Sequence, residues 1–319
     1  MTDDLTCVIA AENAAAIAQC LPRYFMTADA PPPHFVVLED QRALADVIDQ
    51  ADILLAQPAW AAPVLQRAKK LRWLQSTFAG VEPLVDSACR KDYQLTGVKN
   101  IFGPLISEYV FAAVLAHSRH SAYYRRCQSE KNWQPLPYRA LSKQTMAILG
   151  TGSIGVHLAQ TATHFGLSVI GVNRTGKSVA GIDKVVALSA LENQLTEADI
   201  VVLTLPSTPA TQQLVDKQFL AKLKKSALFI NVGRGSLVNE QDLLAALIAG
   251  ELAAAVLDVF ASEPLPENHP LWLAPNLTIT PHNAAVTFAE DIAAIFAKNF
   301  QRFSRGQALD YPIDFARGY

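Results

Sequence analysis

Short apolar segments alternate with longer helical stretches along most of the chain, and this alternation predicts parallel β-strands separated by helices. A first series of strands is expected at residues 5–10, 35–38, 53–56 and 73–76. A second series is expected at residues 146–149, 169–172, 200–205, 228–232, 253–257 and 277–280. The break between the two series indicates two open parallel sheets, so the predicted fold class is α/β.

The segment between the two series has a different pattern. Residues 106–116 are apolar and predict a connecting helix, whereas residues 119–138 are basic, aromatic and Pro-containing, which is typical of a surface arm. Such an arm is suited to pack on a second subunit. A last helical pattern, at about residues 288–303, follows the second series. It could cross back to pack on the first domain and leave a cleft between the two.

A glycine-rich turn follows the first strand of the second series. Residues 150–155 read Gly-Thr-Gly-Ser-Ile-Gly and open a helical stretch. In this setting the first glycine allows a tight turn, the second lets the backbone approach a diphosphate, and the third lets helix and strand pack closely. Because backbone amides at a helix N-terminus attract anions, this context favours a dinucleotide site over a purely structural turn.

The next strand ends without an acidic residue. A carboxylate about 20 residues past the glycines normally binds the adenosine ribose of NAD. Residues 173–178 read Asn-Arg-Thr-Gly-Lys-Ser instead. A guanidinium, an ammonium and two hydroxyls suit a phosphate dianion, which indicates NADP(H) as the preferred cofactor with NAD(H) possible. A solvated basic turn is the alternative interpretation.

The composition narrows the class of partner. Half of the 319 residues are hydrophobic, 18% are charged, and the net charge is -2. Nothing in this balance favours nucleic acid or a membrane surface as partner, and no apolar run is long enough to cross a bilayer. The acidic start, residues 1–4, does not resemble a signal peptide, so a cytoplasmic location is expected. The four cysteines are too scattered for a zinc site.

Arg234, Glu263 and His282 follow three successive predicted strands of the second series. The carboxyl ends of parallel strands meet at one sheet edge, where ligands bind in open α/β folds. Taken singly, each residue has an ordinary explanation as a surface group, a turn residue or a salt-bridge partner. Their joint occurrence predicts a catalytic site at this edge.

These features together resemble the D-isomer-specific 2-hydroxyacid dehydrogenases, particularly their glyoxylate/hydroxypyruvate reductase members. The resemblance covers nearly the whole chain and rests on residues 150–155, 231–235, 257–264 and 281–285, in the family's order. It implies two Rossmann-like or flavodoxin-like parallel-sheet domains with a cleft between them. The implied substrate domain comprises residues 1–102 and 286–319. The implied dinucleotide-binding domain comprises residues 103–285, with a dimerisation helix and arm at about 106–138.

The resemblance also assigns roles to individual residues, with no metal. The implied catalytic residues are Arg234, Glu263 and His282. The implied cofactor-binding residues are Gly150, Gly152, Ser153, Ile154, Gly155, Asn173, Arg174, Thr175, Leu205, Pro206, Thr211, Val232, Gly233 and Asp258. The implied substrate-binding residues are Thr77, Phe78, Ala79, Gly80, Arg234, His282 and Trp272. Trp272 could equally be a core or interface tryptophan, and Phe78 is similarly open.

The implied reaction reduces a small 2-oxo acid, such as glyoxylate or hydroxypyruvate, to its D-2-hydroxy acid. A histidine such as His282 can donate the proton, with Glu263 orienting it. Arg234 can hold the substrate carboxylate and stabilise negative charge on the ketone oxygen. The expected partners are therefore the small acid and a second copy of the chain in a homodimer. The alternative is a dinucleotide-sensing interaction protein without turnover, against which the intact catalytic set argues.

Overall fold

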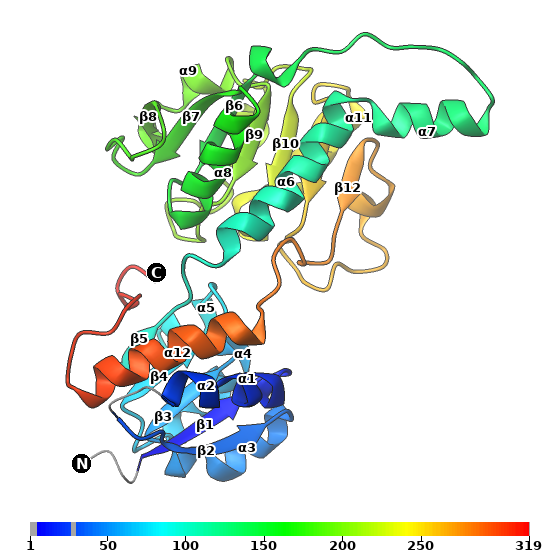
Figure 1. The fold of residues 1–319 in the computed structure, drawn as a ribbon. Helices are drawn as coiled ribbons and strands as arrows, with labels where there is room; N and C mark the ends of the chain where they lie inside the picture. Colours follow the sequence, from blue (N-terminus) through cyan, green and yellow to red (C-terminus); the bar gives the residue numbers. More distant parts are fainter. Residues whose placement is uncertain (1–4, 27–29, 319) are drawn as a thin grey trace. The chain divides into compact units, whose positions relative to one another are not determined.

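The computed structural model describes residues 5–26 and 30–318, so the acidic residues 1–4 lie outside the described part. It divides into two units (Figure 1). Unit 1 comprises residues 1–101 and 287–319, and unit 2 comprises residues 102–286. Each unit is built on a parallel sheet, which confirms the predicted α/β class. None of the helices in the described ranges is both long and apolar enough to cross a membrane.

Unit 1 has a five-stranded sheet in the order β2-β1-β3-β4-β5, with every pair parallel. This order is the flavodoxin-like one. The strands are β1 (Thr6–Ala10), β2 (His34–Leu38), β3 (Ile53–Ala56), β4 (Trp73–Ser76) and β5 (Gln94–Thr96). The helices are α1 (Ala14–Cys20), α2 (Pro22–Phe25), α3 (Gln41–Val47), α4 (Pro58–Ala61), α5 (Glu82–Val85) and α12 (Ala289–Ser304), with 3-10 turns η1 (Ile48–Gln50) and η2 (Ala62–Arg67).

The long helix α12 follows unit 2 in the sequence but belongs to unit 1. It lies along α1 and α2 in Figure 1. Its Phe296 stacks on the fully buried Trp73 of β4, with ring centroids 5.1 Å apart. Its buried Asn299 donates to Oε1 of Gln75 at 3.1 Å. Gln75 in turn donates to the carbonyl oxygen of Ser76 at 2.9 Å. The C-terminal helix therefore supports the strand end that leads into residues 76–80.

Unit 2 has a seven-stranded parallel sheet in the order β12-β11-β10-β9-β6-β7-β8. The strands are β6 (Thr145–Leu149), β7 (Ser168–Asn173), β8 (Lys184–Ala187), β9 (Ile200–Leu203), β10 (Leu228–Asn231), β11 (Ala254–Leu257) and β12 (Leu277–Ile279). The helices are α6 (Phe102–Ser118), α7 (Ser121–Ser129), α8 (Ser153–His164), α9 (Glu192–Leu195), α10 (Lys217–Leu220) and α11 (Glu240–Ile248). The 3-10 turns are η3 (Leu141–Lys143), η4 (Leu188–Ala190), η5 (Gly235–Leu237) and η6 (Pro270–Leu273).

Both faces of the unit 2 sheet are covered, which explains why its strands are almost continuously apolar. Apolar residues of α9, α10 and α11 pack with one face of the strands in a single buried core. Helices α6 and α8 lie on the other face (Figure 1). The strand order reverses between β6 and β9, and in such sheets the ligand binds at the carboxyl ends beside the reversal.

Strands β5 and β8 and helix α7 were not predicted from the hydrophobic pattern. Strands β5 and β8 are short and lie at the edges of their sheets, where a partly exposed strand carries a weaker apolar signal. Helix α7 occupies part of the segment that was predicted only as a surface arm, and Cys127 alone of its nine residues is buried. The connecting helix α6 is also longer than the predicted 106–116.

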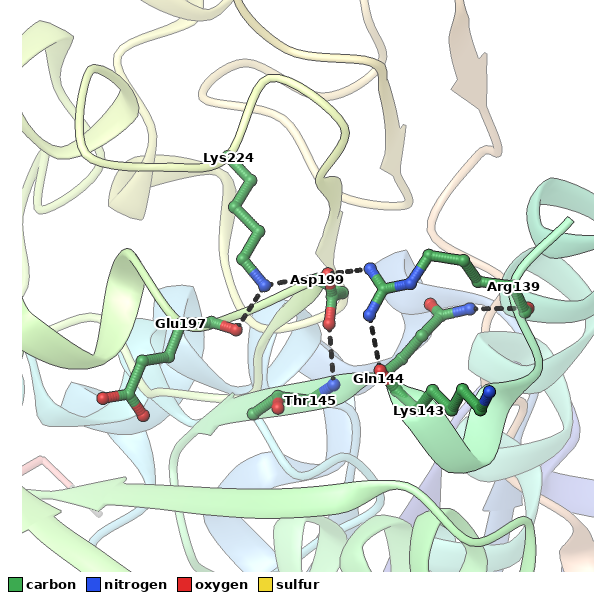
Figure 2. A network of polar contacts seen from close by, with 7 residues as sticks. All are labelled: Arg139, Lys143, Gln144, Thr145, Glu197, Asp199 and Lys224. Carbon is green, nitrogen blue, oxygen red and sulfur yellow. Dashed lines mark hydrogen bonds and ion pairs between the residues drawn. The ribbon is translucent and has the colours of Figure 1, made fainter.

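A polar network attaches the end of the arm to the N-terminal ends of strands in the unit 2 sheet (Figure 2). Asp199, which precedes β9, accepts hydrogen bonds from Arg139 at 2.8 Å, from Lys224 at 2.9 Å and from the amide of Thr145 at 2.9 Å. Its side chain is only 7% exposed. The returning arm, the first residue of β6 and the loop before β10 are thereby joined at one carboxylate.

The charge of Asp199 depends on these bonds. Burial by itself raises the pKa of the carboxyl, but the hydrogen bonds from Lys224, the Thr145 amide and Arg139 outweigh it and hold the pKa below its ordinary value. A carboxyl whose pKa is lowered by folding stabilises the fold above its ordinary pKa. That contribution is lost as the pH falls through the lowered value.

Candidate active site

The glycine turn between β6 and α8 needs its first and third glycines for steric reasons. Gly150 has a φ of +115°, and a Cβ there would lie 2.5 Å from Oγ1 of Thr204. A Cβ at Gly155 would lie 1.9 Å from the carbonyl oxygen of Gly150. A side chain at Gly150 would therefore displace Thr204, which follows β9, and one at Gly155 would displace the backbone that joins β6 to α8.

Gly152 is different, because apart from the residue itself and its two neighbours in the chain no atom lies within 4 Å of the position that its Cβ would occupy. Gly152 and Ser153 are exposed, Ile154 is half-buried, and Ser153 begins the twelve-residue helix α8. An open backbone surface in front of helical amides fits the diphosphate of a dinucleotide. These residues lie after β6, beside the point where the strand order reverses.

Asn173 shapes the loop that follows β7. Its Oδ1 accepts from the amides of Thr175, at 3.1 Å, and Gly176, at 2.8 Å. Its Nδ2 donates to Thr151 Oγ1, at 3.1 Å, and to the carbonyl oxygen of Lys177, at 2.9 Å. Arg174, Thr175 and Lys177 are left exposed on a fixed loop. A carboxylate at position 173 could not donate the two Nδ2 hydrogen bonds.

The loop after β9 is fixed by the buried Thr211. Its hydroxyl donates to the carbonyl oxygen of Pro206 at 2.8 Å and accepts from the amide of Thr208 at 2.9 Å. Leu205 and Pro206 are half-buried in this loop. Sequence reasoning gave Thr211 a cofactor role; the structure shows in addition that it holds the loop that carries Leu205 and Pro206.

Arg234 leaves β10 between two glycines that allow close backbone contacts. A Cβ at Gly235 would lie 1.8 Å from the carbonyl carbon of Phe260, in the neighbouring loop after β11. The buried Asn231 donates to the carbonyl oxygen of Arg234 at 2.9 Å and accepts from the amide of Gly233 at 3.0 Å. The path of the backbone at Arg234 is therefore set by its neighbours, and Val232 is half-buried beside it.

Glu263 and His282, which were predicted to act together, are paired in the structure. Oε2 of Glu263 lies 2.7 Å from Nδ1 of His282, and Oε1 accepts from the amide of Phe260 at 2.8 Å. The imidazole is 54% exposed and the carboxylate 34% exposed. Because a carboxylate only accepts, Nδ1 carries a proton and Nε2 is the nitrogen left for a substrate. Arg234 and this pair follow β10, β11 and β12, which are adjacent strands.

Asp258 holds the segment that carries His282. The carboxylate is 2% exposed, and it accepts from the Thr280 hydroxyl at 2.6 Å and from the amides of Asn283, at 2.9 Å, and Ala284, at 3.0 Å. Its carbonyl oxygen accepts from the amide of His282 at 2.8 Å. Sequence reasoning assigned Asp258 to the cofactor and missed this clamp, whose only sequence signal is its place at a strand end.

In unit 1, residues 76–80 form the loop after β4. The Ser76 hydroxyl accepts from the amide of Phe78 at 3.0 Å, which turns the chain. Thr77 is 2% exposed, and its Oγ1 has no hydrogen-bond partner among the described residues. Phe78 and Ala79 are exposed and Gly80 is half-buried. A buried hydroxyl without a partner fits a loop that binds a polar ligand.

Trp272 lies on η6 with its side chain half exposed. Its indole nitrogen donates to the carbonyl oxygen of Pro266 at 2.9 Å, so that ring nitrogen is already used within unit 2. No group of three or more His, Cys, Asp or Glu residues in the described ranges is placed to hold a metal ion.

Residues 111–284 match the family described as D-isomer specific 2-hydroxyacid dehydrogenase, NAD binding domain. A glyoxylate/hydroxypyruvate reductase A of Yersinia enterocolitica is 35% identical over 269 residues, which is 82% of this chain and 86% of the relative. A solved D-isomer specific 2-hydroxyacid dehydrogenase family protein of Aeromonas salmonicida is 46% identical, with 98% of this chain and 100% of that one covered and a TM-score of 0.91.

An NADPH-dependent glyoxylate/hydroxypyruvate reductase of Sinorhizobium meliloti, solved with NADP and sulfate, is 27% identical. The comparison covers 98% of this chain and 100% of that one, with a TM-score of 0.87. The family predicted from the four sequence segments is thereby confirmed, and with it a dinucleotide-binding unit. The chain belongs to the D-isomer-specific 2-hydroxyacid dehydrogenase family.

Proposed function

We propose that the protein reduces a small 2-oxo acid of the glyoxylate or hydroxypyruvate type to the D-2-hydroxy acid, with NADPH as the preferred reductant. The observation that carries this proposal is the 2.7 Å pairing of Glu263 with His282 on strand ends adjacent to that of Arg234. A proton donor with an oriented imidazole and a cation for a carboxylate are the two protein groups that this reduction needs. The named reductase relatives support the substrate class.

Each protein group has one task in this proposal. The nicotinamide supplies the hydride when the dinucleotide is bound. Nε2 of His282 gives its proton to the ketone oxygen, while Nδ1 keeps its hydrogen bond to Glu263. Arg234 binds the carboxylate and lowers the energy of the negative charge that develops on the ketone oxygen. Oxidation of the hydroxy acid would run the same proton transfer in reverse.

We further propose that residues 77–80 contribute to binding the substrate carboxylate. The buried Thr77 hydroxyl, which has no partner within the described residues, supplies one donor. The amides of Phe78, Ala79 and Gly80 would supply others. The side chain of Phe78, 42% exposed, then contacts the remainder of a small substrate. The same role is proposed for the exposed ring of Trp272.

The proposed preference for NADPH rests on the loop after β7. Asn173 gives this loop its shape without adding a negative charge, and Arg174 and Lys177 stand exposed on it. A 2'-phosphate requires cations and hydroxyls where NAD-specific sites have a carboxylate. The Sinorhizobium meliloti relative solved with NADP is described as NADPH-dependent, which supports the same choice here.

Arg174→Ala tests this preference. Loss of a charge-assisted contact worth about 2 kcal/mol should lower kcat/KM for NADPH about 30-fold. The value for NADH should stay unchanged, because that cofactor has no 2'-phosphate. The measurement is initial-rate kinetics with glyoxylate and hydroxypyruvate and both cofactors. Lys225→Ala removes the same charge from an exposed site outside the loop, and it should leave both values unchanged. Equal efficiency of the wild-type protein with NADH and NADPH would refute the preference.

We also propose that the protein forms a homodimer through α6, α7 and the arm. A groove of about 790 Å³ lies between α6, α7 and the strands β11 and β12. Alanines, leucines and a valine form about half of its lining, and Tyr109, Tyr123 and the basic side chains His117, His120, Arg125 and Arg126 form much of the rest. Trp133 lies in the arm just after α7 and is 99% exposed. A groove along α6 and α7 and a fully exposed tryptophan just after α7 are typical of a surface that a second copy covers.

Light scattering at micromolar concentration checks the dimer. The wild-type mass should be twice that of the chain, which is 34.6 kDa. Trp133→Glu should shift the population toward the monomer, since a charge would be buried at the interface. Met26→Glu places the same acid at an 80% exposed apolar site in unit 1 and should leave the mass unchanged. A monomeric wild-type protein would rule the dimer out.

A further inference from the structure

We infer that Tyr109 is a positioning residue for the proton donor, acting through Thr280 and Asp258. Tyr109 lies on α6, 171 residues from Thr280 in the sequence, and its hydroxyl oxygen lies 2.6 Å from Oγ1 of Thr280. Thr280 Oγ1 lies 2.6 Å from Oδ1 of Asp258. The three side chains form a continuous hydrogen-bonded chain from a packed helix to the segment that carries His282.

The direction of this chain follows from its acidic end. The Asp258 carboxylate can only accept, so the single hydroxyl proton of Thr280 is donated to it. Thr280 Oγ1 is then left as an acceptor, and Tyr109 must be the donor. Burial, together with the nearby charge of Asp258, outweighs the opposing effect of the Thr280 hydrogen bond and raises the pKa of Tyr109, which keeps this donor protonated.

The segment needs such support because His282 has a φ of +51°. A left-handed backbone is unfavourable for a residue with a Cβ and persists where the surroundings fix it. Two sets of hydrogen bonds fix the backbone at His282. The His282 amide donates to the carbonyl oxygens of Asp258, at 2.8 Å, and Thr280, at 3.1 Å. The Asp258 carboxylate binds the amides of Asn283 and Ala284, the two residues that follow His282.

Tyr109 fixes the orientation of Thr280, and Thr280 satisfies Oδ1 of Asp258 next to the Asn283 amide. Without the tyrosine hydroxyl, Thr280 loses its donor and becomes free to rotate away from the carboxylate. The segment then samples conformations in which Nδ1 of His282 is not aligned with Glu263. Proton transfer demands this alignment, whereas dinucleotide binding at the glycine turn does not.

Tyr109→Phe removes only the hydroxyl. Tyr123→Phe is its matched control, because Tyr123 lines the same groove between α6, α7, β11 and β12 but is not part of the hydrogen-bonded series from Tyr109 to Asp258. The first readout is amide hydrogen exchange at residues 283 and 284 in the protein without ligands. Exchange there should quicken about five-fold in Tyr109→Phe, as expected for one lost hydrogen bond, and stay unchanged in Tyr123→Phe. Thr280→Val should quicken exchange at these two residues at least as much. Thr280→Ser keeps the hydroxyl and should exchange at the wild-type rate.

The second readout is steady-state kinetics, which reports kcat and KM separately and rests on the proposed function. Tyr109→Phe should lower kcat about five-fold and leave KM for the dinucleotide unchanged. Unchanged exchange in Tyr109→Phe, or an equal change in Tyr123→Phe, would overturn the inference. Faster exchange with unchanged kcat would also overturn the catalytic part of it. A wild-type protein without turnover would refute the proposed function, while exchange at residues 283 and 284 would still decide the role of Tyr109.

Discussion

Replacing His282 by asparagine is expected to lower kcat about 10³-fold, within the range typical of a lost general acid. Asparagine tolerates the left-handed backbone of position 282 better than alanine does, so the segment between Thr280 and Ala284 should keep its shape. The amide side chain of asparagine cannot supply the proton that Nε2 of His282 gives to the ketone oxygen. Steady-state rates with glyoxylate and hydroxypyruvate measure the loss, and fluorescence titration with NADPH should show unchanged affinity.

His164→Asn is the control for this substitution, because it makes the same change at an exposed histidine at the end of α8. It should retain full activity. If His282→Asn kept more than about a tenth of the wild-type kcat, His282 would not be the proton donor. A wild-type protein that binds NADPH tightly but reduces none of a panel of 2-oxo acids would instead support the dinucleotide-sensing alternative.

The second large effect is expected for Arg234→Met, which should lower kcat/KM for the 2-oxo acid about 10³-fold, comparable to removal of one transition-state donor. Both KM and kcat should change, because the guanidinium binds the carboxylate in the ground state and stabilises the ketone oxygen in the transition state. Asn231 and the two flanking glycines set the backbone here, so methionine should leave the loop in place.

Arg234→Lys separates charge from geometry. Lysine keeps the positive charge but lacks the planar pair of donors that matches a carboxylate, so its activity should lie between those of Arg234→Met and the wild type. The measurement is the same kinetic analysis, with NADPH saturating and the acid varied. An Arg234→Met variant whose KM for the acid is unchanged would exclude Arg234 as the residue that binds the carboxylate.

The parts that could be predicted from the sequence are those whose signal is local. A buried parallel strand is a short apolar run, and a glycine turn between a strand and a helix is read directly from residues 150–155. The pairing of Glu263 with His282 could also be predicted, because the two residues follow adjacent strands of one sheet. Edge strands such as β8 and the polar helix α7 lack that apolar signal and were missed.

Contacts between residues that are distant in sequence could not be predicted in this way. Nothing in the apolar run of α6 distinguishes Tyr109 as the partner of Thr280. The clamp of Asp258 on Asn283 and Ala284 depends on the path of the chain after β12, which no propensity fixes. Thr77 is a similar case, since a threonine at a strand end gives no sign that its hydroxyl is buried without a partner.

The division of the chain has a consequence for its synthesis on the ribosome. Unit 2 is one continuous segment, whereas unit 1 is completed only by α12, whose Phe296 stacks on Trp73 of β4. Because the chain emerges from its N-terminus, part of the first sheet's face stays uncovered while the next 185 residues, 102–286, are made. Phe35 of β2 and Trp73 of β4, on which Phe296 of α12 packs, therefore stay without this cover in the nascent chain and are candidates for chaperone binding. The dinucleotide-binding unit is expected to be the first to finish folding.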